Sequence, residues 1–135
     1  MTLDDIRDYL GREFPQVFSS DVLSLDAAED GLAVLRLTPD EAHLRPGEVI
    51  SGPTVMLLAD AAAYAALLSL GPAAKMSVTS NLNMSFLRAA RLGPDIVTSA
   101  RVLKMGKRLA TIVCESASDE TMIAHATLTY AMPPN

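Results

Sequence analysis

The first apolar positions of the chain recur every three or four residues, which predicts an amphipathic helix. Thr2 can serve as its N-cap, and Asp4 and Asp5 place carboxylates in the first turn, where the helix dipole favours them. The apolar stripe consists of Leu3, Ile6 and Leu10. Gly11 and Pro15 limit this helix on its C-terminal side.

Strand-like patterns follow the first helix. Residues 17–26 are irregular but strand-like, and residues 32–38 (LAVLRLT) read as a strand rich in leucine and valine. A turn signal at residues 29–31 separates the two segments, so they could pair as a hairpin. Residues 39–48 (PDEAHLRPGE) are polar and contain two prolines, which indicates a loop.

The longest apolar run of the chain begins after this loop and predicts a helix that is buried on every side. Ser51 can cap its start, Pro53 fits the first helical position, and Gly71 and Pro72 end it about five turns later. The apolar positions are 55–59, 61–63, 65–68 and 70. Asp60 interrupts this apolar run. A carboxylate at the centre of a membrane-spanning helix costs about 2.5–3.5 kcal/mol, so a membrane span is not expected.

The N-terminus is acidic and has no signal-peptide character, which favours a cytoplasmic location.

Four further strands are predicted at residues 78–86, 96–104, 109–116 and 121–131. Strict alternation in the first would place Leu82 and Met84 on one face, and Thr79, Asn81 and Asn83 on the other. Short turns at residues 105–107 and 118–120 make the late strands antiparallel. The order of elements predicts an α+β fold, a single domain over residues 1–135 in which an antiparallel sheet wraps one central helix.

Composition narrows the class of function. The net charge is −5, so no nucleic acid partner is expected, and a lone cysteine, Cys114, excludes an internal disulfide or a cysteine-based zinc site. The glycines form neither a dinucleotide-binding nor a phosphate-binding loop, and His43 and His125 lack metal-ligand spacing. No cofactor and no metal are expected. The 20 alanines and seven methionines point to a core of small and flexible side chains.

Asp60 is the residue that the apolar helix does not explain. A buried carboxylate is costly unless it has partners or a chemical role. Asp60 therefore either caps a structural element, pairs across a dimer interface, or acts in catalysis. Gly52 places a backbone N–H at the positive end of the same helix, where it either polarises a carbonyl or only allows a tight turn. A carboxylate and such an N–H suffice for thioester hydrolysis, because a thiolate whose acid has a pKa of about 8.5 leaves without a strong general acid.

Several segments carry a resemblance to a known family. Residues 45–53 (RPGEVISGP), 58–60 (LAD), 78–88 (VTSNLNMSFLR), 92–96 (LGPDI) and 106–108 (GKR) together resemble the hotdog-fold acyl-CoA thioesterases of the phenylacetate-degradation type. The resemblance covers most of the chain. It implies a hotdog fold, an acyl-CoA substrate, and a homodimer or homotetramer with the active site at the subunit interface.

The resemblance also implies roles for individual residues. Asp60 would be general base or nucleophile, the Gly52 N–H would polarise the thioester carbonyl, and Thr79 would orient the attacking water. Candidate substrate-binding residues are Arg45, Ser51, Tyr64, Asn81, Arg88, Lys107 and Arg108. The acyl pocket would be lined by Met56, Leu57, Tyr64 and Met84.

One departure from the family pattern keeps an alternative open. The typical helix start reads His-Gly-Gly, whereas this chain has Ser51, Gly52 and Pro53, and Arg45 stands where some members have asparagine. Because proline has no N–H, an oxyanion hole that uses that position would lose one donor. A non-catalytic hotdog protein that binds an acyl-CoA or another apolar ligand is therefore the alternative. A dehydratase or hydratase ranks last, because neither histidine is placed to pair with an acidic residue on the helix.

Overall fold

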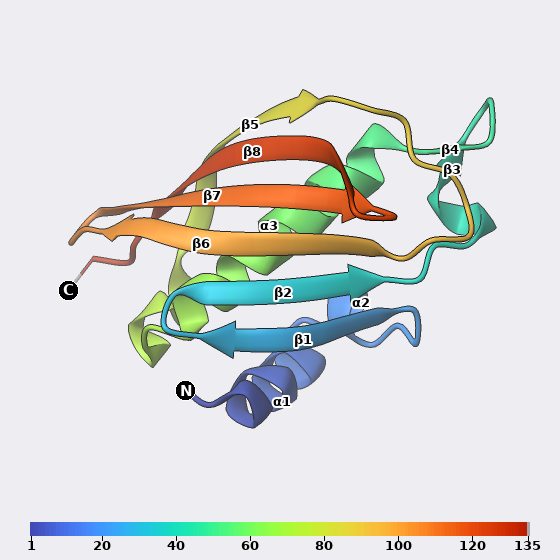
Figure 1. The fold of residues 1–135 in the computed structure, drawn as a ribbon. Coiled ribbons are helices and arrows are strands. Elements are labelled where there is room, and N and C mark those ends of the chain that lie inside the picture. The colour runs from blue at the N-terminus through green and yellow to red at the C-terminus, as the bar shows by residue number, and fades with distance from the viewer. Residues whose placement is uncertain (135) are drawn as a thin grey trace.

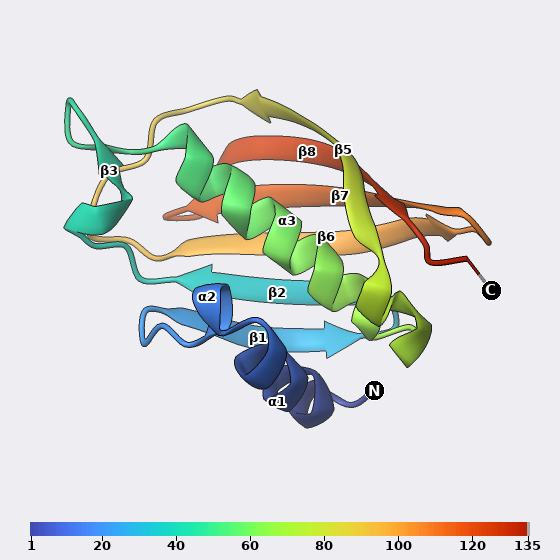
Figure 2. The same cartoon turned by 180° about the vertical axis from the view of Figure 1, so that it is seen from behind.

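One six-stranded antiparallel sheet packs against one long helix, α3 (Gly52–Leu68), in strand order β1-β2-β6-β7-β8-β5 (Figure 1). The computed structural model describes residues 1–134. The strands of this sheet are β1 (Leu23–Glu29), β2 (Leu32–Leu37), β5 (Val78–Phe86), β6 (Ile96–Met105), β7 (Leu109–Ser118) and β8 (Thr121–Ala131). From behind, α3 lies across the sheet and α1 (Leu3–Glu13) lies beside β1 (Figure 2). This is the α+β arrangement that the order of elements predicts, and it is the hotdog arrangement that the family resemblance implies.

Small elements lie in the segments that connect the strands with α3. A two-stranded sheet of β3 (Leu44–Arg45) and β4 (Val49–Ile50) precedes α3, and the 3₁₀ helices η1 (Glu41–His43) and η2 (Pro72–Met76) lie on either side of it in the chain. The loop predicted at residues 39–48 therefore contains one 3₁₀ turn and most of a small hairpin. Within residues 1–134, no helix is both long and apolar enough to cross a membrane.

The N-terminal helix begins as predicted and ends at Glu13, between the two residues predicted to limit it. The Thr2 hydroxyl accepts a hydrogen bond from the Asp5 N–H at 3.1 Å, and the Asp5 carboxylate accepts from the Thr2 N–H at 3.0 Å. The helix continues through Gly11 to Glu13, and a second helical turn, α2 (Pro15–Phe18), occupies part of the segment predicted as strand. Pro15 favours this turn because its fixed φ suits the start of a helix. The strand prediction for residues 17–22 is therefore wrong, and β1 begins at Leu23.

The start of α3 matches its prediction to within one residue. The Ser51 hydroxyl accepts a hydrogen bond from the Thr54 N–H at 3.2 Å, so Ser51 is the N-cap. The first helical residue is Gly52, and Pro53 occupies the second position. The missing N–H of Pro53 leaves no helical hydrogen bond unmade, because the first turn has no acceptor for it.

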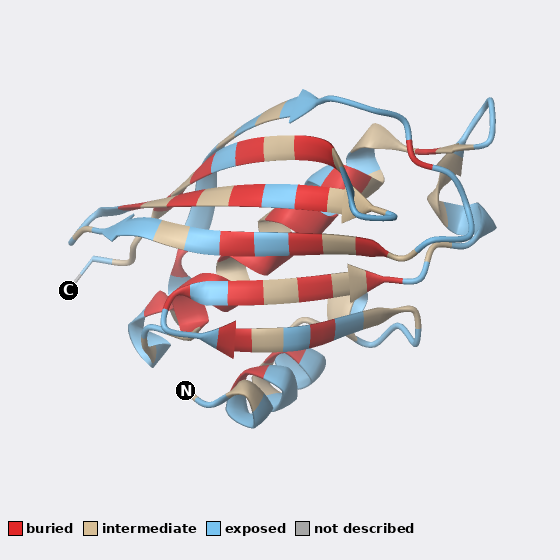
Figure 3. Cartoon of the chain, in the orientation of Figure 1, coloured by how far each residue is buried: buried red, intermediate tan, exposed pale blue. Residues whose placement is uncertain are grey.

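Burial of α3 on every side is wrong for the isolated chain. Much of α3 is buried behind the sheet (Figure 3), and all six of its alanines are buried. One stripe at helical spacing stays partly or fully exposed. This open stripe consists of Pro53, Met56, Leu57, Asp60 and Tyr64. It stays open because the sheet ends at the edge strand β5. The carboxylate of Asp60 therefore lies in an apolar stripe that the chain itself covers only in part.

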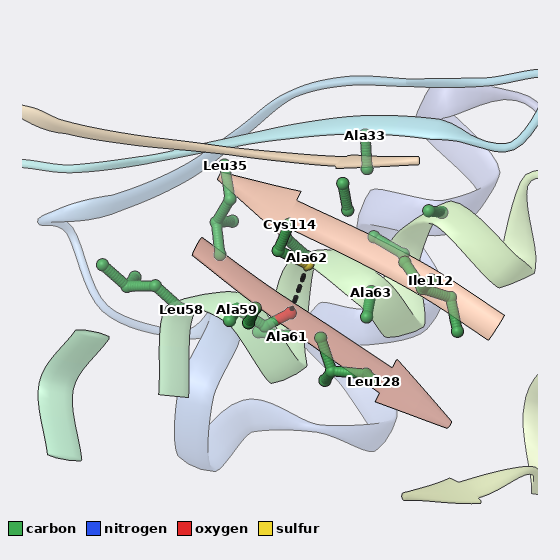
Figure 4. Close-up of a cluster of buried hydrophobic side chains, with 14 of the residues drawn as sticks. Ala33, Leu35, Leu58, Ala59, Ala61, Ala62, Ala63, Ile112, Cys114 and Leu128 are labelled. Atoms are coloured by element: carbon green, nitrogen blue, oxygen red, sulfur yellow. Dashed lines mark hydrogen bonds between the residues drawn. The ribbon is translucent and has the colours of Figure 1, made fainter. Parts of the chain in front are cut away.

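Small side chains allow the sheet to approach the buried side of α3 closely. Ala59, Ala62 and Ala63 are fully buried against leucine and isoleucine side chains of the strands (Figure 4). Cys114 of β7 points inward, as predicted, and its thiol donates a weak hydrogen bond to the Ala59 carbonyl at 3.4 Å. Because an alanine side chain requires little space, α3 can pack closely against the sheet at these positions.

A β-bulge in β5 changes which side chains face the helix. The register with β8 shifts between Thr79 and Asn81, so Ser80 is the extra residue. As a result Thr79 pairs with the inward residue Tyr130, while Asn81 pairs with Thr129 on the outer face. The strict alternation predicted for this strand is wrong, because one inserted residue reverses the orientation of those before it.

Candidate functional site

A cavity of about 580 Å³ opens beside the middle of α3, and we call it the Asp60 cavity. The open stripe of α3 forms one wall, β5 and β8 form the second, and α1 and α2 form the third. Its residues are Tyr9, Glu13, Phe14, Val17, Met56, Leu57, Asp60, Ala61, Tyr64, Ser77, Val78, Thr79, Leu82 and Tyr130. All three tyrosines of the chain contribute to this cavity. The volume and the apolar lining suit a small-molecule ligand.

The Asp60 carboxylate is held asymmetrically at this cavity. Its Oδ1 accepts one hydrogen bond from the Thr79 hydroxyl at 2.6 Å and another from the Tyr130 hydroxyl at 2.6 Å. The same Tyr130 hydroxyl lies 2.9 Å from the Asp60 backbone carbonyl. Within residues 1–134 no hydrogen bond reaches Oδ2, so this second oxygen is available to a ligand.

The tyrosines form a connected wall around the carboxylate. The ring of Tyr64 stacks on that of Tyr130, with centroids 6.4 Å apart and planes within 9°. The Tyr64 hydroxyl donates to the Lys75 carbonyl at 2.6 Å and lies 3.2 Å from the Tyr9 hydroxyl. Burial raises the pKa of Tyr64 and, more strongly, that of Tyr130, where the hydrogen bond to Asp60 adds to the effect. Both hydroxyls therefore stay protonated at neutral pH.

A second cavity, of about 400 Å³, lies at the N-terminus of α3, and we call it the Gly52 cavity. Arg45 and Arg88 line it together with Gly52 and the ring of Phe86. One guanidinium nitrogen of Arg88 donates to the Met122 carbonyl at 2.9 Å, which orients this side chain. Two arginines beside the positive end of a helix dipole favour an anionic group.

The predicted site residues fall into three groups. Asp60, Thr79 and Tyr64 meet in the Asp60 cavity, and Gly52, Arg45 and Arg88 meet in the Gly52 cavity. The residues that line neither cavity are Ser51, Asn81, Met84, Lys107 and Arg108. Ser51 is the N-cap of α3. Asn81 lies on the outer face of the sheet, and Lys107 and Arg108 lie in the turn between β6 and β7.

The remaining titratable candidates have other surroundings. The Nδ1 atom of His43 accepts a hydrogen bond from the N–H of Asp40, the N-cap of η1, at 2.9 Å. His125 lies opposite Glu115 on the outer face of the sheet. Burial raises the pKa of the Cys114 thiol to about 12, which makes it a poor nucleophile. In the described part of the chain, no group of three or more potential ligands is placed to hold a metal ion. Asp60 is thus the side chain best placed for acid–base or nucleophilic chemistry.

Tyr130 is the site residue that sequence reasoning missed. Its place on the inward face of the last strand was predictable, and a buried tyrosine hydroxyl generally requires a hydrogen-bond partner. The pairing of β8 with β5 and the bulge at Ser80 were not predictable from local pattern. These two features bring Tyr130 and Thr79 to the same oxygen of Asp60.

Comparisons with known proteins identify the family and the fold. The profile of the thioesterase superfamily matches residues 47–125. Human acyl-coenzyme A thioesterase 13 is 31% identical over 99 residues, which cover 73% of this chain and 69% of that protein. A crystal structure of a provisionally assigned thioesterase from Silicibacter sp. TM1040 superposes with a TM-score of 0.87 at 37% identity, covering 99% of this chain and 93% of that one. Zebrafish thioesterase superfamily member 2 shares the fold, with a TM-score of 0.87 at 23% identity over 98% of this chain and 99% of its own.

Proposed function

The chain belongs to the thioesterase superfamily, and on that premise we propose that it is an acyl-CoA thioesterase, which hydrolyses a thioester to a carboxylic acid and free CoA. The observation that carries the proposal is the Asp60 carboxylate, held through Oδ1 and open at Oδ2, in a largely apolar cavity. An apolar acyl group would occupy this cavity with its carbonyl beside Asp60. The phenylacetate-degradation subtype stays a prediction.

The proposed chemistry uses Oδ2 in one of two ways. As a general base, Oδ2 takes a proton from a water molecule, whose oxygen attacks the thioester carbonyl carbon, and the tetrahedral intermediate expels the CoA thiolate. As a nucleophile, Oδ2 attacks that carbon itself, the thiolate leaves, and water then hydrolyses the resulting anhydride. Thr79 orients the carboxylate or the water in both cases. Neither route requires a metal or a cofactor.

The proposed oxyanion donor lies too far away to act within one protomer. Gly52 precedes Asp60 by eight residues of α3, which is about 12 Å along the helix axis. The two residues also line different cavities. A thioester carbonyl that contacts Asp60 therefore cannot reach the Gly52 N–H of the same chain. We propose that the second half of the site comes from a second copy of this chain.

The edge strand β5 offers a geometry for this assembly. Its first residues, Val78 and Thr79, border the Asp60 cavity, and its last residue, Phe86, borders the Gly52 cavity. If two copies pair through β5 in antiparallel fashion, the Phe86 end of one strand lies beside the Thr79 end of the other. The Gly52 cavity of one copy then adjoins the Asp60 cavity of its partner. The exposed apolar residues that such a dimer would cover include Met56, Leu57, Val78, Phe86 and Leu87.

Charge supports the same placement of the substrate. Arg45 and Arg88 at the Gly52 cavity suit the phosphates of a CoA moiety, and the α3 dipole adds to their positive potential. Lys107 and Arg108 lie in an exposed turn and remain candidates for further phosphate contacts. The net charge of −5 does not conflict with a polyanionic ligand, since only a local cluster of cations is required.

A second candidate function rests on Pro53. This proline leaves one backbone N–H fewer at the start of α3 than the glycine of the typical family pattern would supply. A protein that binds an acyl-CoA without hydrolysing it would tolerate this loss. Kinetics separate the two functions, because binding without turnover is expected only of the second.

The test is hydrolysis of a panel of acyl-CoAs that includes arylacetyl, short-chain and medium-chain groups, with free CoA detected by a thiol reagent. Cys114 should add little background, because it is buried and its pKa is about 12. We expect Asp60→Asn to lower kcat by about 10²–10⁴-fold, since an amide neither accepts the proton nor attacks. Full activity of Asp60→Asn would refute the mechanism, and binding of a panel member without any turnover would favour the binding protein.

A further inference from the structure

We infer that Tyr130 is a positioning residue of this site. Its hydroxyl binds Oδ1 of Asp60, so that Oδ2 is the oxygen left to take part in the reaction. The inference rests on the proposed function, because it concerns the residue proposed to act on the thioester. The geometric basis is the 2.6 Å contact between the Tyr130 hydroxyl and Oδ1. Thr79 shares this oxygen, but the two donors differ in their surroundings.

Tyr130 is the buried donor of the two. It is 3% exposed, and its partner in the sheet, Thr79, is exposed at the mouth of the cavity. In the single chain, Thr79 is therefore the more accessible of the two donors to solvent, and the Tyr130 hydroxyl is held by the protein. Loss of Tyr130 would therefore leave one lone pair of Oδ1 without its donor on the protein side.

The surroundings of Tyr130 fix the direction of its hydroxyl. Its ring stacks on Tyr64, and its hydroxyl lies between Oδ1 and the backbone carbonyl of Asp60, at 2.6 and 2.9 Å. Both acceptor atoms belong to Asp60, so the position of the hydroxyl is fixed relative to α3. The carboxylate plane is thereby held with Oδ2 directed away from β8.

A hydrogen bond to an ionised carboxylate also favours its charged form. The titratable groups around Asp60 are Tyr130 from β8, Tyr64 from α3, Cys114 from β7, and Tyr9 and Glu13 from α1, with Lys75 over the ring of Tyr9. Glu13 is the one other carboxyl among the residues that line the cavity; it is exposed, and its Oε1 lies 3.3 Å from Nε of Arg12. Removal of the Tyr130 hydroxyl, which lies 2.6 Å from Oδ1, should therefore disfavour the charged form of the Asp60 carboxylate.

The experiment is Tyr130→Phe, which keeps the ring and its stacking and removes only the hydroxyl. We expect kcat to fall about 10–100-fold, as for a lost hydrogen bond to a charged group, while KM changes little. We also expect the acid limb of the kcat profile to move up by about one pH unit. A variant with unchanged kcat and an unmoved acid limb would overturn the inference, even if Asp60→Asn is inactive.

Two further measurements keep the test independent of folding and of turnover. Titration of the ¹³C-labelled Asp60 carboxyl by NMR should show the same upward movement in Tyr130→Phe, whether or not a substrate is known; an unmoved titration would overturn the inference. If Tyr130→Phe does not fold, 3-fluorotyrosine can be incorporated at position 130. It keeps the hydroxyl as a stronger hydrogen-bond donor and should move the acid limb of the kcat profile to lower pH. An unmoved limb would again contradict the inference.

A matched control separates positioning from general loss of a buried hydroxyl. Ser116 of β7 is buried and its hydroxyl lies 2.7 Å from that of Thr98, away from both cavities. Ser116→Ala should lower the thermal stability by an amount comparable with Tyr130→Phe but leave the acid limb unmoved. An equal shift in both variants would show that destabilisation, and not Tyr130, moves the profile. Failure of the wild type to hydrolyse any panel member would instead reject the proposed function, and the ¹³C titration would still decide the role of Tyr130.

Discussion

Arg36 of β2 joins two carboxylates outside the site. Its Nε lies 2.8 Å from Oδ2 of Asp26, and its Nη1 lies 3.4 Å from Oδ2 of Asp95. The hydrogen bond from Arg36 holds the pKa of Asp26 below its usual 3.8. Because the pKa is lowered in the folded state, the stabilisation is fully present above the usual pKa of aspartate and is lost as the pH falls through the folded value.

We predict that Asp26→Asn lowers the free energy of unfolding at pH 7 by less than about 1 kcal/mol, because the pair is partly exposed to solvent. The difference from the wild type should shrink as the pH falls below the usual value. Urea unfolding of the wild type and of Asp26→Asn at pH 7 and near pH 3 measures the loss of unfolding free energy at each pH. Asp21→Asn, at an exposed carboxyl with no ion pair in the described chain, is the control. An equal penalty at both pH values would contradict the electrostatic explanation.

At the scale of the element, the tight packing of α3 has a measurable consequence. Ala62 is fully buried against the sheet, so a larger side chain has no space there. We predict that Ala62→Leu destabilises the fold by about 1–3 kcal/mol through overpacking. Ala73→Leu, at an exposed position of η2, should change stability by less than about 0.5 kcal/mol. Equal unfolding midpoints for the two variants would show that α3 tolerates more volume than its contacts indicate.

The elements also show what local pattern can predict. Residue type and spacing predict the helix caps Thr2 and Ser51, and they predict the strands β5 to β8 with bounds that are correct to within a few residues. They also single out Asp60 as the functional candidate. The turn α2 was missed because Pro15 acts as a helix start as well as a helix limit. The bulge at Ser80 leaves no signal in an alternating strand, and its position depends on how β5 pairs with β8.

At the scale of the molecule, the exposed apolar surface is the feature that one chain does not explain. Val78 is 62% exposed and Phe86 is 53% exposed, on an edge strand that has no partner on its outer side in the described chain. Unpaired edges of this kind are usually short, charged or covered. The buried helix predicted from sequence and the open stripe observed in the single chain become consistent if a second copy covers that stripe. Sequence alone could predict the apolar positions but not which of them a partner would cover.

Mixing two inactive variants tests whether the site is shared between copies. Asp60→Asn removes the carboxylate, and Gly52→Pro removes the N–H, while the added Cβ would meet Phe86 at an ordinary contact distance of 3.5 Å. If each site combines Asp60 of one copy with Gly52 of the other, a mixed dimer holds one site with neither substitution. Random exchange of subunits should therefore restore about a quarter of the wild-type rate.

The matched control for this mixture combines two substitutions that belong to the same half of the site. Asp60 and Thr79 belong to the same half of the proposed site, since the Thr79 hydroxyl lies 2.6 Å from Oδ1 of Asp60 in one chain. Mixing Asp60→Asn with Thr79→Val therefore leaves every site with a substitution, and we expect no gain over the average of the two variants. Native mass spectrometry should establish that mixed dimers have formed in both experiments. If mixed dimers form and the mixture of Asp60→Asn with Gly52→Pro stays inactive, the Asp60 carboxylate and the Gly52 N–H do not act on one thioester across the interface. The reason is that one site of each mixed dimer would then contain the same residues as the wild-type site.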